Sequence, residues 1–288
     1  MKNIILSKNF CKKNLKQLLS FSIILLIATT LFSSAIIINR NISNDFDKKY
    51  ENLNTADTFF TIPNIQYSNT LINDIKNIKN INEIETKNGI MLTAPIEMNG
   101  SKQDLNQIFY NLNDEANINK YKIIEETSDY VENPIYLPYY IYKNSELKIK
   151  DKYEFKLDGR NYTFTIKGFL EEMQYGNYSS SVIGVYLTDD SYNYLVKNNL
   201  DKKVTTISII SNNDHKVYNN VSKYLSKNNI SIINKEYAEQ AKNKRLAISN
   251  ILVIILIVFS ATILLISLLV SKFKIQNNIE EEMTNMEC

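Results

Sequence analysis

The chain has 288 residues, of which 44% are hydrophobic and 22% charged, with a formal net charge of +2. Two cysteines cannot cross-link a chain of this length into a disulfide scaffold, and the ordinary apolar content excludes a disordered chain. The near-neutral charge gives no electrostatic reason to expect nucleic acid as a partner. The apolar residues gather in two blocks, one near each end of the chain.

The first block, residues 18–38, contains 21 residues and no charge. As a helix it would be about 31 Å long, close to the roughly 30 Å hydrocarbon core of a bilayer. A cleaved signal peptide has a shorter apolar region of about 7–15 residues that ends at a small-residue cleavage site. Here Ser33, Ser34 and Ala35 are followed by further isoleucines. We therefore predict an uncleaved transmembrane helix at 18–38.

The second block, residues 251–271, is also uncharged and long enough for one crossing. A helical pattern continues upstream of it, which predicts a stalk helix at 236–250. The two blocks together contain no ionisable side chain. An ion or proton path normally needs such a group within the bilayer, so a channel formed by these two helices alone is not expected.

The lysines near the first block predict the orientation of the chain. Residues 1–17 form a basic amphipathic segment with five lysines and no acid, so the positive-inside rule places the N-terminus in the cytoplasm. Two crossings return the tail, 272–288, to the cytoplasm and leave 39–235 as an extracytoplasmic domain. We therefore expect a two-pass protein of a bacterial cell membrane. Three cations on the outer side weakly oppose this orientation: Lys242, Lys244 and Arg245.

Short apolar patterns predict a mixed outer domain. Alternating apolar residues on both sides of Asp158-Gly159 predict a β-hairpin over 152–168. Further strands are predicted at 57–62, 90–98, 182–187, 204–210 and 230–233. Helices are predicted at 71–78, 105–112, 191–198 and after Asp214, which is the predicted N-cap, with Val217, Val221 and Leu225 facing inward. Strands and helices alternate without a strict βαβ repeat, so the predicted fold class is α+β.

No motif for catalysis or nucleotide binding is present. The sequence lacks the phosphate loop G-x-x-x-x-G-K-[ST], the metalloprotease motif H-E-x-x-H and the nucleophile motif G-x-S-x-G. A single histidine, His215, cannot build a His-based metal site. The carboxylate pairs Glu171-Glu172 and Asp189-Asp190 are interpreted as solvated loop residues. We therefore expect no enzyme activity, no cofactor and no metal site in this chain.

Three stretches resemble the permease subunits of ABC transporters of the FtsX-like and MacB-like family. KNFCKKNLKQLLSFSIILLI, residues 8–27, resembles the basic helix that leads into the family's first span. DKYEFKLDGRNYTFTIKGFLEE, residues 151–172, resembles the hairpin of its extracytoplasmic core domain. FKIQNNIEEEMTN, residues 273–285, resembles the segment after its second span. The resemblance implies a MacB-like core domain between two transmembrane helices.

The resemblance also implies partners. Members of the family need at least four spans, so this chain is expected to be the N-terminal half of a permease. It would act with the missing permease half or a second permease subunit, within the lipid bilayer. A separate ABC ATPase would bind the cytoplasmic face and drive movement of the outer domain, for export or for force transmission. The candidate ATPase contact is an acidic run that could also be a solvated helix face: Glu280, Glu281, Glu282 and Met283.

A different class remains open: a two-span membrane adaptor or sensor, such as a polysaccharide chain-length regulator. Such adaptors have the same topology, usually with proline-rich sequence before the second span and long helices outside. Here no proline follows Pro138, and the hairpin at 152–168 is β structure. An outer domain built from two long antiparallel helices would exclude the permease family.

Overall fold

The computed structural model describes residues 15–175 and 182–284, with the backbone alone at 16–18, 278–279 and 281–284. The chain divides into two compact units, Met1–Asp45 with Leu246–Cys288, and Phe46–Arg245. We call the first the helical unit and the second the sheet unit.

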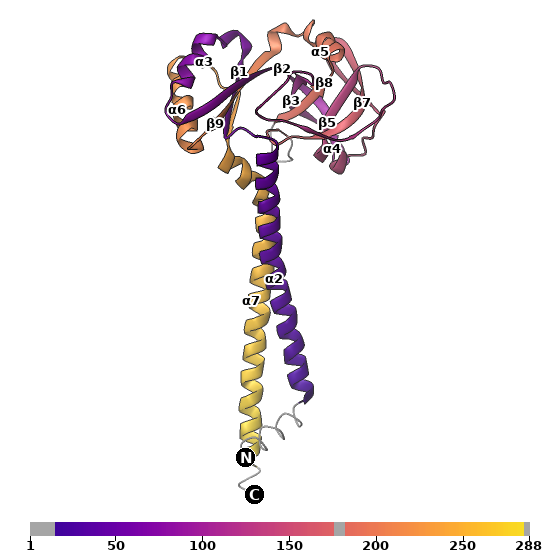
Figure 1. Cartoon of the computed structure of the whole chain (residues 1–288). Helices are drawn as coiled ribbons and strands as arrows, with labels where there is room; N and C mark the ends of the chain where they lie inside the picture. Colours follow the sequence, from indigo (N-terminus) through magenta and orange to yellow (C-terminus); the bar gives the residue numbers. More distant parts are fainter. Residues whose placement is uncertain (1–14, 176–181, 285–288) are drawn as a thin grey trace. The chain divides into compact units, whose positions relative to one another are not determined.

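The described part of the helical unit contains residues 15–45 of the long helix α2 (Leu15–Asn52) and residues 246–284 of the long helix α7 (Ala238–Thr284) (Figure 1). Both are long and apolar enough to cross a membrane, which fits a membrane protein. Ala28 and Ala35 of α2 are fully buried, and Ser260 Oγ of α7 donates to the carbonyl oxygen of Ala28 at 2.7 Å. Small residues at these positions let the two backbones approach closely.

Within its described residues, the sheet unit has ten strands in the order β10-β1-β9-β2-β3-β8-β5-β7-β4, and β6 pairs with β7. All pairs are antiparallel except β3 with β8 and β5 with β7. This mixture confirms the α+β class. The elements are β1 (Thr58–Pro63), η1 (Asn64–Gln66), α3 (Asn69–Lys76), β2 (Ile81–Met98), β3 (Ser101–Asn111), β4 (Lys122–Glu126), β5 (Pro134–Pro138), α4 (Tyr139–Asn144), β6 (Lys152–Leu157), β7 (Arg160–Glu171), β8 (Val182–Leu187), α5 (Asp189–Val196), η2 (Leu200–Lys202), β9 (Lys203–Ser211), α6 (Asp214–Lys227) and β10 (Asn234–Tyr237).

One half of the sheet unit is covered by α3 and α6 (Figure 1). Leu71 and Ile75 of α3 lie one helical turn apart, as do the predicted inward residues of α6, and all are buried. They pack on alternate residues of β1 and β9, which share one face of the sheet. The buried residues of this core are Phe60, Ile62, Leu71, Ile75, Ile207, Ile209, Val217, Val221 and Leu225.

The other half forms a larger core enclosed by strands β2, β3 and β5–β8 with α4 and α5. Aromatic rings of the hairpin are central to it. The Phe155 ring centroid lies 5.3 Å from that of Tyr162 and 5.8 Å from that of Phe109. Aromatic pairs at such separations add to the stabilisation from burial alone.

β2 joins the two halves because its ends pair with different strands. Residues 81–90 of β2 pair with β9, and residues 89–98 pair with β3. The change of partner falls at Gly89, where a Cβ atom would lie 2.6 Å from Cγ2 of Ile108 and 3.1 Å from the carbonyl oxygen of Phe109. Only glycine allows the strands to approach this closely.

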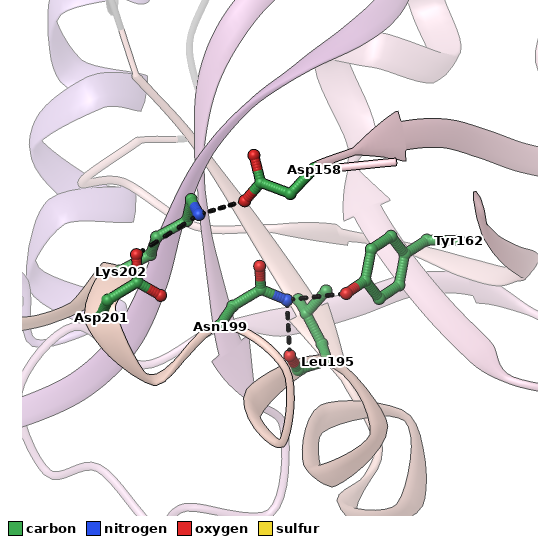
Figure 2. Close-up of polar contacts among 6 residues, drawn as sticks. All are labelled: Asp158, Tyr162, Leu195, Asn199, Asp201 and Lys202. Carbon is green, nitrogen blue, oxygen red and sulfur yellow. Dashed lines mark hydrogen bonds and ion pairs between the residues drawn. The ribbon is translucent and has the colours of Figure 1, made fainter. Parts of the chain in front are cut away.

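The predicted hairpin is confirmed as β6 and β7, with the turn at Asp158 and Gly159. Both turn residues have positive φ, 49° and 81°, as a type I′ turn requires. Figure 2 shows how the hairpin is held against η2: Lys202 Nζ lies 2.5 Å from Asp158 Oδ2, and Asn199 Nδ2 donates to Tyr162 Oη at 3.0 Å. A second bond from Asn199 Nδ2 to the Leu195 carbonyl oxygen, 2.8 Å, ties the turn after α5 to the same contact.

The helix predicted at 105–112 is wrong, because these residues form strand β3. Ile108 faces one core and Phe109 faces the other, so residues 107–110 of the strand are buried on both sides. A strand buried on both faces shows no apolar–polar alternation. The spacing of its apolar residues therefore resembled a helix by coincidence.

Two smaller predictions also need correction. The last strand, predicted at 230–233, lies instead at Asn234–Tyr237, while Ile230 and Ile232 pack against the α6 core outside any strand. The cap of α6 is Asn213, whose side chain accepts from the Lys216 N–H at 3.0 Å; Asp214 is the first helical residue.

Candidate functional site

The end of α2 and the start of α7 belong to one small cluster in the sheet unit, which we call the helix-base cluster. Phe46, Leu53 and Met173 are buried against one another, with Tyr50 packed alongside. Phe46 and Tyr50 lie in the last two turns of α2, and Met173 follows β7 closely. Six charged residues complete the cluster: Asp47, Lys49, Glu171, Glu172, Lys242 and Arg245.

Two ion pairs cross the helix-base cluster. Lys242 Nζ of α7 lies 2.6 and 2.7 Å from the two carboxylate oxygens of Asp47 in α2. Lys49 Nζ of α2 lies 2.7 Å from Glu171 Oε1 at the end of β7. Both pairs are partly exposed, and such pairs contribute about 0–1 kcal/mol each. They therefore orient the two helix bases more than they stabilise them.

Arg245 is the largely buried cation of the cluster. Its Nη2 donates to the carbonyl oxygen of Met173, and its guanidinium carbon lies 5.6 Å from the ring centroid of Phe46. Burial lowers the pKa of Arg245, and the carboxylate of Glu172 opposes that shift. The guanidinium stays charged because its pKa begins far above neutral. Arg245 thus links α7 to the backbone segment after β7.

Glu172 is buried, with 2% of its surface exposed, and Arg245 acts on its charge. Its Oε1 accepts from the Tyr175 N–H at 2.9 Å and its Oε2 from the Gln174 N–H at 3.2 Å. Burial raises the pKa of Glu172 to about 7, although Arg245 favours the charged form. A Cβ at position 184 would lie 2.8 Å from Glu172 Oε1, so Gly184 makes room for the carboxylate.

A second cation, Lys87 of β2, has its ammonium group buried in the same region. Its Nζ has no hydrogen-bond partner among the described residues and lies 5.1 Å from the ring centroid of Tyr110 and 5.0 Å from that of Tyr186. Burial lowers the pKa of Lys87, and Asp114 and Glu172 are among the carboxylates that oppose this. The buried ionisable groups described for this region are therefore one acidic side chain, Glu172, and two basic side chains, Lys87 and Arg245.

Hydroxyl groups connect the segment after β7 with the sheet. Tyr175 Oη lies 2.9 Å from Thr61 Oγ1 of β1, which lies 3.2 Å from Thr206 Oγ1 of β9. Tyr110 Oη of β3 lies 2.8 Å from the same Thr206 oxygen. Residues 171–175 thus contact both helix bases on one side and strands of the sheet on the other.

The sequence-predicted candidates belong to different elements of the chain. Glu280 is exposed on α7, with its Oε1 3.4 Å from Nε2 of Gln276. The other three members of the predicted ATPase contact have side chains outside the described residues: Glu281, Glu282 and Met283. His215 lies in the first turn of α6, with its ring centroid 5.3 Å from that of Tyr237. No cluster of three or more metal-ligating side chains occurs among the residues described.

Sequence reasoning missed the helix-base cluster because it interpreted Glu171-Glu172 as solvated. That interpretation is wrong for Glu172, which is buried, while Glu171 is partly exposed in an ion pair. A signal was present: Phe169 and Leu170 precede the pair and Met173 follows it. An acid that continues the alternation of an apolar strand points to burial with a partner.

No protein-family model matches the chain, and no curated protein sequence is similar to it. Similar solved structures include the extracellular domain of the noncanonic ABC-type transporter YknZ from Gram-positive bacteria, at 9% identity and a TM-score of 0.32, over 62% of this chain and 100% of that one. The periplasmic region of MacB from Actinobacillus actinomycetemcomitans matches at 10% identity and a TM-score of 0.29, over 66% and 94% of the two chains. A third, provisionally described as a lipoprotein from Bacillus anthracis, has 10% identity and a TM-score of 0.34, over 63% and 96%.

These structures include extracytoplasmic domains of the transporter group that the sequence resembles, so the recognised likeness reappears in the structural comparison.

Proposed function

We propose that this chain is a membrane permease subunit, or the N-terminal part of one, of an ABC transporter of the FtsX-like and MacB-like family. A separate ATPase would supply the energy, and the sheet unit would respond to movement of the spans. The observation that carries the proposal is the helix-base cluster. Each of α2 and α7 runs without a break from an apolar stretch into this cluster, so a rotation or shift of either helix acts on residues 171–175.

The ten-stranded sheet unit also favours this class over the adaptor class. A polysaccharide chain-length regulator is expected to place long antiparallel helices outside the membrane. The helices within the described part of the sheet unit, apart from the ends of α2 and α7, have at most 14 residues. The described part of the sheet unit therefore lacks the long antiparallel helices expected of the adaptor class.

The proposed orientation has both termini in the cytoplasm. The cations that opposed it have partners in the sheet unit: Lys242 pairs with Asp47, Lys244 Nζ lies 2.6 Å from Glu236 Oε1, and Arg245 donates to Met173. These contacts give a structural reason for basic residues on the outer side. Substrates vary widely in the family that the sequence resembles and include peptides, lipids and lipoproteins, so the subunit would export one of these classes or would transmit force to an outer partner.

Labelling of cysteines should report this orientation, because both native cysteines, Cys11 and Cys288, lie in the segments proposed to be cytoplasmic. In intact cells a membrane-impermeant maleimide should leave them unlabelled until the membrane is permeabilised. Ser128→Cys adds a thiol at an exposed position between β4 and β5 and should be labelled in intact cells. Labelling of the native chain without permeabilisation would contradict the proposed topology.

Co-purification should recover a partner ATPase that carries a phosphate loop. We expect reversal of the acidic run (Glu280→Lys, Glu281→Lys and Glu282→Lys) to lower the yield of that ATPase at least tenfold. An acidic contact implies a basic surface on the ATPase, and the introduced lysines would repel that surface. A matched control reverses three exposed acids of the sheet unit: Glu115, Glu132 and Glu146. For both variants, mass spectrometry of the eluate measures the yield of the ATPase, and the rate of ATP hydrolysis in the eluate measures its activity.

Three results would contradict the proposal. Recovery of a tyrosine kinase in place of an ATPase would favour the adaptor class. Equal loss of the ATPase in the acidic-run variant and in the control would show that the acidic run is not the ATPase contact. An eluate without ATP hydrolysis from the native chain would remove the transporter assignment.

A further inference from the structure

A cavity of about 380 Å³ lies between α2 and α7 within the helical unit. Such a volume falls within the range of small-molecule sites. Apolar residues of both helices, including Ile24 and Ile263, form most of its wall. Its polar lining consists of Ser20, Ser267 and Ser271, with Lys274 at one end.

The cavity is about as long as one leaflet of a bilayer is deep. It lies wholly on one side of the contact between Ser260 and Ala28, toward the start of α2 and the end of α7. Ile263 and Lys274 are eleven residues apart on α7, which corresponds to about 16 Å along the helix axis. A hydrocarbon core is roughly 30 Å thick, so the cavity reaches from the membrane surface to about the midplane.

An unpartnered hydroxyl shows that the cavity is built for more than an apolar contact. Ser267 is 6% exposed, and its Oγ has no hydrogen-bond partner among the described residues. Serine in a membrane helix commonly satisfies its hydroxyl with a nearby carbonyl or across a helix interface. Because Ser267 lines the cavity, an acceptor atom of an occupant can complete its hydrogen bonding.

We propose that this cavity binds one anionic glycerophospholipid of the surrounding leaflet. Its phosphate lies at Lys274, its ester carbonyls face the serine hydroxyls, and one acyl chain extends along Ile24 and Ile263. From the surface inward, the chemistry of the cavity changes from cationic to hydroxyl-lined to apolar, which is the order of groups in such a lipid. Basic residues between helices near the membrane surface are typical of sites for anionic headgroups. The inference requires only that both helices cross a bilayer, as proposed above.

The test uses the full chain, purified from membranes in mild detergent and incubated with dioleoyl phosphatidylglycerol or dioleoyl phosphatidylcholine. Native mass spectrometry then counts the lipid retained. We expect the native chain to retain more dioleoyl phosphatidylglycerol than dioleoyl phosphatidylcholine. Lys274→Gln should retain about fivefold less of the phosphatidylglycerol, which is the effect of one surface cation. Lys272→Gln is the matched control because its side chain points about 160° away around the helix and does not line the cavity.

A second variant tests the hydroxyl. Ser267→Ala removes the donor without adding bulk to the cavity wall, so it should also weaken retention about fivefold, as loss of one net hydrogen bond predicts. Thr262→Val is its control, since Thr262 already donates to the Val258 carbonyl oxygen at 2.8 Å and is exposed.

Four outcomes would overturn the lipid site. They are equal retention of the two lipids, equal loss in Lys272→Gln and Lys274→Gln, displacement of the lipid by inorganic phosphate, and capture of a second polypeptide rather than lipid by a photoreactive residue at Ile266. Release of the chain from membranes by alkaline carbonate would refute the proposed membrane topology itself. A chain that stays in the membrane and fails the lipid test leaves that topology intact.

Discussion

Arg245→Met should lower the free energy of unfolding of the sheet unit by about 3 kcal/mol. Methionine keeps much of the side-chain volume but leaves the Met173 carbonyl oxygen without its donor and Glu172 without the strongest of its cationic influences. The full chain in detergent can be unfolded with urea and followed by tyrosine fluorescence, since it has 19 tyrosines and no tryptophan.

Lys242→Met is the control for Arg245→Met, because it removes a neighbouring cation whose ion pair is partly exposed. We expect a loss of at most about 1 kcal/mol from this variant. Equal losses in the two variants would show that Arg245 has no special place in the cluster. Under the proposed function, Arg245→Met should still bind the ATPase but lose the ATP-dependent change in protease sensitivity of the sheet unit.

Glu172→Gln should remove a pH dependence of stability between about pH 4.5 and pH 7. Burial raises the pKa of Glu172 to about 7 in the folded chain, so the folded state holds a proton that the unfolded state releases at lower pH. The stability that Glu172 contributes is fully present below the unfolded pKa and is lost as pH rises through 7. The shift in pKa corresponds to about 3 kcal/mol. Between pH 4 and pH 8 the free energy of unfolding of Glu172→Gln should therefore rise by that amount relative to that of the native chain.

The measurement is the difference in urea unfolding free energy between the two chains at each pH, so groups common to both cancel. Asp57, whose pKa burial also raises, is one of these. Glu171→Gln is the control, since its carboxylate is partly exposed and paired with Lys49. A difference between native chain and Glu172→Gln that stays constant with pH would refute the buried titration.

Patterns that depend on neighbouring residues were predictable from the sequence. The hairpin followed from alternation on both sides of Asp158-Gly159, because a turn with two positive φ values favours those residues. The inward faces of α3 and α6 followed from helical spacing. The helix predicted at 105–112 failed because β3 is buried on both faces, and only the full sheet supplies the second face.

Local sequence patterns did not predict the helix-base cluster. Its members come from positions 46–53, 171–173 and 242–245, which the chain brings together only when it folds. Nothing in the local sequence distinguishes Arg245, which is largely buried, from Lys244, which is exposed. Likewise, the unpartnered hydroxyl of Ser267 became visible only once α2 lay beside α7.

The sequence by itself determined that this chain has two apolar helices of membrane-spanning length and an α+β unit between them. Those properties depend on hydrophobicity and on periods of two to four residues, which local sequence records directly. Only the tertiary structure decided which of two adjacent glutamates is buried, which cation faces it, and where the paired helices leave a cavity. Desolvation and charge pairing depend on distances between residues far apart in the chain, so they emerge only from the folded molecule.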